Sequence, residues 1–256
     1  MNGTKPVHTA ISYFGTFDDI DTLAGTDIAP LFCCRNRFDD RIGGGIVFGN
    51  HDWDYGDPAL IMERTKRPSF YVDWVEGISL LVLNTNLFWF YPGTPPAVDF
   101  DQKQAQLDLI RQVCDTISTA SHLVILHHHG LFRDRREQYT GRSEDVFNVD
   151  PLRVIAGCDP AGELSREVYP WLVNVQQRGV QVVLVGGDLG MRTKTYALEM
   201  PEGIWLLGSG INNSVSRDWA PDYVTTFEPD SVLIFEHDPE RGVLEWRFVD
   251  LDGLVK

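Results

Sequence analysis

The residues best suited to chemistry in this sequence are three consecutive polar ones, Asn50, His51 and Asp52. They follow the apolar run 45–48 and Gly49, so a buried strand that ends at a glycine would release three polar side chains onto one loop at a sheet edge. An asparagine oxygen can bind a metal ion, a histidine can donate a proton to a leaving oxygen, and an aspartate can orient that histidine or cap the next segment. The same residues also fit a simple turn with an N-cap, so they decide nothing by themselves.

Two further apolar runs also end in residues that can bind metal ions. Residues 122–126 precede three consecutive histidines, and residues 180–185 precede two glycines and an aspartate. Imidazole and carboxylate groups suit zinc, iron or manganese, and an amide oxygen suits the harder of these ions. A single histidine at a strand end is more often structural, but three in succession favour a ligand role, because burying imidazoles without partners is unfavourable. The candidate metal ligands are therefore Asn50, His127, His128 and Asp188.

The remaining pattern predicts an α/β chain that brings these strand ends together. A run over 79–83 is apolar on both faces, which is typical of a central strand, and Glu76-Gly77 before it fits a hairpin turn. In an open α/β sheet the loops after such strands gather along one edge, where sites form. We expect strands at 9–14, 46–48, 70–74, 78–84, 122–126, 180–185, 204–207, 231–236 and 243–250, a loop with a helical turn at 53–68, and helices from Asp99 or Asp101 to Ile117 and over 163–178.

Composition narrows the class of protein. A chain of 256 residues, 43% hydrophobic and without internal repeats, predicts one domain over 1–256 with a polar insertion at 133–162. The formal net charge of −15 argues against a nucleic-acid groove. None of the four cysteines lies in a Cys-x-x-Cys pair, so we expect reduced thiols. With no apolar signal core and no run of transmembrane length, a cytoplasmic protein without a membrane segment is expected; the sequence does not determine its oligomeric state.

The segments named above resemble the calcineurin-like metallophosphoesterase family. Residues 49–52 match its Gly-Asn-His-Asp/Glu signature. Residues 104–110, followed by 123–128, resemble its succession of a helix, an apolar strand and His-His-Pro, with His129 in place of the proline. Residues 183–190 are similar to the segment that carries its Gly-His-x-His motif. The resemblance extends from about residue 45 to the end of the chain.

This resemblance implies a four-layer αββα sandwich and a two-metal centre that hydrolyses phosphoesters. It implies Asn50 as a metal ligand that also contacts the substrate phosphate, and His51 as the donor of a proton to the leaving oxygen, with Asp52 as the second candidate catalytic residue. His127 would share a metal with Asn50, and His128 would replace it if the register slipped by one residue. Two metals about 3.5–4 Å apart would polarise the phosphoryl group and generate the nucleophile.

The sequence departs from the family pattern at the second metal subsite. The early Asp-x-His motif is absent, and Thr16 stands where the bridging aspartate is expected. Asp188 and Gly190 replace the two histidines of the last motif, and a glycine has no side chain with which to bind a metal. We therefore expect one divalent transition metal (manganese, iron or zinc) where an intact family member holds two. Two explanations stay open: a chain that lacks the first strand of the fold, or a member with a degenerate or single-metal site.

The sequence-based hypothesis is a metal-dependent phosphoesterase that acts on a phosphorylated small molecule or another phosphoester. The alternative is a non-catalytic binding or regulatory protein on the same fold, with zero or one metal. A third interpretation is a hydrolase with one metal held by Asn50, His127 and Asp188.

Overall fold

A computed structural model describes residues 7–10, 47–49, 52–53, 57–88, 97–128, 164–186, 195–209 and 231–250. Its main feature is a six-stranded sheet with the order β2–β3–β4–β5–β7–β6. Strands β3, β4, β5 and β7 are parallel, and β2 and β6 pair antiparallel at the two ends of the order. The strands are β2 (Tyr71–Val75), β3 (Ile78–Val82), β4 (His122–His127), β5 (Gln181–Gly186), β7 (Trp205–Ser209) and β6 (Thr195–Glu199).

A second, antiparallel sheet has three strands in the order β1–β8–β9. They are β1 (Val7–Ala10), β8 (Ser231–Asp238) and β9 (Val243–Asp250). The described helices are α4 (Pro58–Thr65), the 3-10 helix η1 (Thr85–Phe88), α5 (Ala97–Thr116), the short π-helix η2 (Leu164–Val168) and α8 (Tyr169–Gln177).

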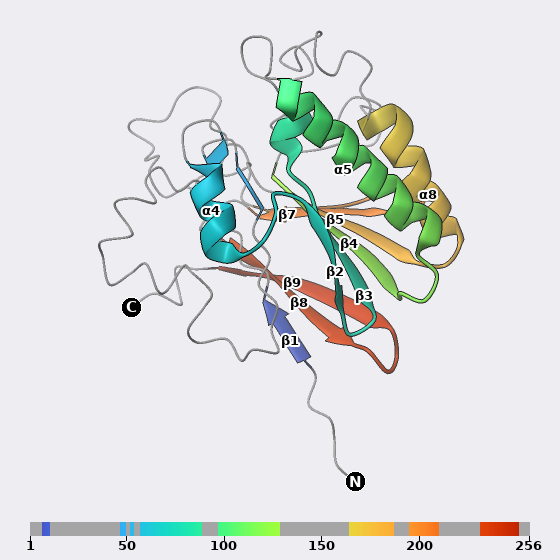
Figure 1. The fold of residues 1–256 in the computed structure, drawn as a ribbon. Helices are drawn as coiled ribbons and strands as arrows, with labels where there is room; N and C mark the ends of the chain where they lie inside the picture. The colour runs from blue at the N-terminus through green and yellow to red at the C-terminus, as the bar shows by residue number, and fades with distance from the viewer. Residues whose placement is uncertain are drawn as a thin grey trace, which may run out of the picture.

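Both faces of the six-stranded sheet are covered (Figure 1). Helices α5 and α8 lie over one face, and the small sheet lies on the other side. Leu123 of β4 and Leu184 of β5 pack in the core under the helices, whereas Val124 and Val183 pack in the core shared with β8 and β9. The parallel strands are thus apolar on both faces, as such burial requires. The α/β class that the sequence predicts is confirmed.

Local sequence signals explain how several elements begin and end. The β2–β3 hairpin turns at Glu76 and Gly77, whose positive φ angles of 46° and 92° suit a two-residue turn between antiparallel strands. Asp57 caps α4 by accepting the backbone N–H of Leu60 at 2.9 Å. Gly179, with φ of 90°, follows the end of α8, as the sequence predicts.

Some predicted boundaries are wrong. Helix α5 begins at Ala97, so Asp99 and Asp101 lie within the helix and not at its N-cap position. The first strand, Val7–Ala10, overlaps the strand expected at 9–14 over Thr9 and Ala10, and residues 11–14 lie outside the described residues. Residues 47–49 are irregular, although a strand was expected at 46–48. The side-chain amide of Asn86 donates to the backbone carbonyls of Phe48 and Gly49 there, in place of a neighbouring strand. The sequence analysis also missed β6 and the full length of α4.

Two buried histidines link the sheets at the amino edge, the edge at which β3, β4 and β5 begin. The rings of His122 on β4 and His237 on β8 meet edge to face with centroids 5.9 Å apart. The hydroxyl of Ser121 lies 2.9 Å from His122 Nδ1 and 3.5 Å from His237 Nε2. Burial, and then the neighbouring His237, lower the pKa of His122 to about 4. Burial also lowers the pKa of His237, although Glu76 and Asp238 oppose that effect.

Acidification below about pH 6.5 should reduce the free energy of unfolding, and His122→Gln should make that loss smaller. Because the pKa of His122 is lowered by folding, the unfolded chain binds a proton that the folded chain does not, so stability is lost as the pH falls from about 6.5 towards 4. Each proton that only the unfolded chain binds lowers the free energy of unfolding by up to about 1.4 kcal/mol per pH unit. Urea unfolding of both proteins at several pH values measures the slope, and an identical slope in the variant would contradict this assignment.

Candidate functional site

Two hydrogen bonds join Gly49 to Asp52 and Trp53, and they give Asp52 a defined structural role. The N–H of Gly49 donates to Asp52 Oδ2 at 3.0 Å, and the N–H of Trp53 donates to the carbonyl of Gly49 at 3.0 Å. Gly49 therefore acts as the N-cap of a helical turn, and Asp52 reaches back to it from the third helical position. The ring of Phe48 packs edge-on against Trp53, with centroids 5.7 Å apart. Asp52 therefore binds the backbone before it instead of capping the segment after it, and its expected contact with His51 lies outside the described residues.

The turn lies directly against a histidine from β4's end. A Cβ atom placed on Gly49 would lie 3.2 Å from His128 Cε1 and 3.3 Å from Asp52 Oδ2. Both distances are shorter than ordinary van der Waals contacts, so only a glycine fits here without displacing its neighbours. The contact brings together two segments that lie far apart in the sequence and that the sequence analysis treated as parts of one site.

The two described histidines of that site are both buried. His127 is 2% exposed and pairs in register with Gly186, at the carboxyl edge where β4 and β5 end. His128 is 4% exposed and is the histidine whose ring contacts Gly49. Strand alternation predicts opposite faces for the two side chains; because His128 follows the last residue of β4, this stays a prediction.

Three buried amide side chains near this edge were missed by the sequence analysis. Asn86, in η1, donates from Nδ2 to the carbonyls of Phe48 and Gly49 at 3.0 and 3.3 Å. Asn84 Oδ1 accepts from the N–H and from Nδ2 of Asn86 at 3.2 and 2.8 Å. Gln106 of α5 accepts the N–H of Asn84 at 2.7 Å and donates to its carbonyl at 3.1 Å. The sequence feature that could have indicated these amides is the polar triplet 84–86, which directly follows an apolar strand.

The other predicted site residues, Asn50, His51 and Asp188, lie outside the described residues. Within the described ranges, no three histidine, cysteine, aspartate or glutamate side chains gather closely enough to hold a metal ion. The donor set still has suitable chemistry, because two buried imidazoles stand at one strand end and imidazole binds zinc, iron and manganese. The described residues thus offer His127 or, as its alternative, His128, and the further donors would have to come from Asn50 and Asp188.

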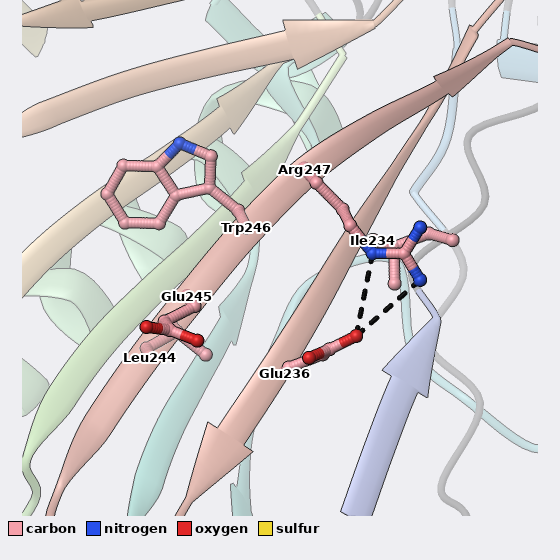
Figure 2. Close-up of a pocket in the computed structure, with 6 residues that line it drawn as sticks. All are labelled: Ile234, Glu236, Leu244, Glu245, Trp246 and Arg247. Atoms are coloured by element: carbon pink, nitrogen blue, oxygen red, sulfur yellow. Dashed lines mark hydrogen bonds and ion pairs between the residues drawn. The ribbon is translucent and has the colours of Figure 1, made fainter.

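The small sheet carries a cavity of about 420 Å³ that is separate from these residues (Figure 2). Two of the residues that line it, Arg247 of β9 and Glu236 of β8, form an ion pair, with Nε and Oε1 3.5 Å apart. Both side chains are substantially exposed, and such ion pairs contribute little to stability. Among the predicted site residues that the structure describes, none lines this cavity.

Comparisons with known proteins assign no family. No protein-family model matches the sequence. A search of curated proteins also finds no significant match. Among the described residues, no helix is both long and apolar enough to cross a membrane.

Gly49→Ala should destabilise the protein by about 1–3 kcal/mol, because an added methyl group crowds a packed site. Combining it with His128→Ala should cost less than the sum of the two single changes, since the smaller side chain removes the crowded ring. Urea unfolding of the four proteins in the cycle measures the coupling energy. His122→Ala, at the opposite edge of the sheet, is the control partner and should be additive with Gly49→Ala. Additivity of Gly49→Ala with His128→Ala would contradict the contact.

Proposed function

We propose that this chain is a metal-dependent phosphoester hydrolase of the calcineurin-like metallophosphoesterase type, with a single metal ion. The contact between Gly49 and His128 is the observation that carries the proposal. It joins the Gly-Asn-His-Asp segment to the histidine segment at the carboxyl edge of a largely parallel sheet, which is where α/β proteins place their sites. The proposal is supported by this contact between two segments that resemble motifs of that family.

The layer arrangement also supports the proposal. A helical layer, a mixed sheet and a second sheet are stacked in that order, which corresponds to three layers of a four-layer αββα sandwich. The proposed fourth layer would cover the outer face of the small sheet.

The proposed roles follow from the chemistry of each group. The amide oxygen of Asn50, the imidazole of His127 and the carboxylate of Asp188 would hold the ion, with His128 as the alternative imidazole ligand. The ion supplies Lewis-acid polarisation of the phosphoryl group when it is bound. His51 would contact the phosphate and protonate the leaving oxygen. Asp52 would support that loop through the hydrogen bond that it accepts from Gly49.

The substrate class that fits best is a small phosphoester. A net charge of −15 repels polyanions, so a nucleic acid is disfavoured, whereas a local cation attracts a single phosphate group. A non-catalytic binding protein on the same fold remains the second candidate. Thr16 and Gly190, at positions where the family supplies metal ligands, favour it.

The purified chain should bind about one transition-metal ion, because one set of candidate ligands is intact. Elemental analysis after dialysis against manganese or zinc measures the stoichiometry. Asn50→Ala and His127→Ala should reduce it, whereas the control His122→Ala should not. Two tightly bound ions per chain would contradict the single-metal proposal and would point to a second ligand set among Asp18, Asp19 and Asp21.

The chain should hydrolyse p-nitrophenyl phosphate weakly with added manganese, because the bridging aspartate expected at Thr16 is missing. His51→Ala should change that rate little, since the activated leaving group barely needs an acid, but should slow an alkyl phosphate by about 10²–10⁴-fold. Steady-state assays of both substrates measure the difference. Robust turnover of the aryl ester that Asn50→Ala abolishes would contradict the single-metal form and favour a complete two-metal centre.

A further inference from the structure

We infer that Asn86 is a positioning residue for the loop that carries Asn50 and His51, which it holds through the two peptide groups that precede them. The role of that loop in metal and phosphate binding rests on the proposed function. The clamp, by which we mean the hydrogen bonds from Asn86 to the carbonyls of Phe48 and Gly49, rests on contacts that the structure describes. Neither the resemblance nor the sequence analysis assigns a role to Asn86.

The geometry of Asn86 suits it to set the direction of the chain. Its Nδ2 donates to the carbonyls of two successive residues, Phe48 and Gly49. The carbonyl of Gly49 belongs to the peptide group that leads into Asn50, and it also accepts the N–H of Trp53. One side-chain amide therefore holds the point where the helical turn starts.

Asn86 is itself fixed by hydrogen bonds to Asn84, which in turn is bound by Gln106. The Oδ1 atom of Asn84 accepts two hydrogen bonds from Asn86, which determines the orientation of both amide groups. Gln106 clamps the backbone of Asn84 from α5 with one accepted and one donated hydrogen bond. The chain of contacts runs from a long helix, through the end of β3, to the loop, so that loop does not depend on its own short turn for its position.

The burial of this group indicates that it does more than fill space. Asn84 and Gln106 are 0% exposed and Asn86 is 3% exposed. Burying three amides costs more free energy than burying apolar side chains of the same size. Part of that cost is not compensated, because Nδ2 of Asn84 has no hydrogen-bond partner among the described residues. An apolar side chain at position 86 would fill the same volume but would leave the carbonyls of Phe48 and Gly49 without this donor.

The chain offers a matched control at the amino edge. Gln181 of β5 donates from Nε2 to the carbonyl of Gly203 at 2.8 Å and exchanges hydrogen bonds with Gln176. It is therefore a side-chain amide that also donates to a backbone carbonyl, but it lies at the end of the sheet away from the loop. Gln181→Ala should lower overall stability without affecting residues 49–53.

The test compares Asn86→Ala with Gln181→Ala in the full chain by hydrogen exchange and by manganese titration. In Asn86→Ala, the backbone amides of Gly49 and Trp53 should exchange on the order of tenfold faster than in the control at matched overall stability. The reason is that the carbonyls of Phe48 and Gly49 lose the hydrogen bonds from Asn86. Its manganese affinity should fall by a similar factor, while the control keeps wild-type affinity. Gln106→Leu, which removes only the support behind Asn84, should shift the same amides by a smaller factor and serves if Asn86→Ala does not fold.

The outcomes separate this inference from the proposed function. Equal exchange of residues 49–53 in Asn86→Ala and Gln181→Ala overturns the clamp, whether or not the chain binds metal. Faster exchange with unchanged manganese affinity overturns the positioning role. Wild-type protein that binds no manganese overturns the metal assignment, and the exchange comparison then decides the clamp by itself.

Discussion

Strands β3, β4 and β5 are buried on both faces, and the rest of the structure depends on that constraint. Leu123 and Val124 of β4 are nearly inaccessible although they point to opposite sides, one towards the helices and the other towards the small sheet. Such strands have no face on which a polar side chain can reach water. Buried polar side chains therefore gather where these strands begin and end, and each group there needs partners of its own.

The two edges meet this requirement with different chemistry. At the amino edge, burial lowers the pKa of both His122 and His237 and so favours their neutral forms. At the carboxyl edge, Asn84, Asn86 and Gln106 form hydrogen bonds without any ionisable group. The contact between the sheets thus responds to acid, whereas the three amide groups do not titrate.

Gly49 shows how closely packing and proposed chemistry are combined. Its N–H bonds Asp52, its carbonyl accepts from Asn86 and Trp53, and its Cα faces the ring of His128. A larger residue would disturb several of these contacts together. The glycine of the Gly-Asn-His-Asp signature is therefore a packing residue in its own right, and the contacts that hold it come largely from outside the signature.

The sequence by itself determined the α/β class, the double-sided strands, the Glu76-Gly77 hairpin and the end of α8 at Gly179, because each depends on local periodicity or backbone preference. Only the tertiary structure decided that 47–49 is irregular, that His128 meets Gly49 and that Asn86 binds the loop. These contacts join residues about 40 or more positions apart. Hydrogen-bond partners at such separations follow from how the layers stack, and neither periodicity nor residue type records that.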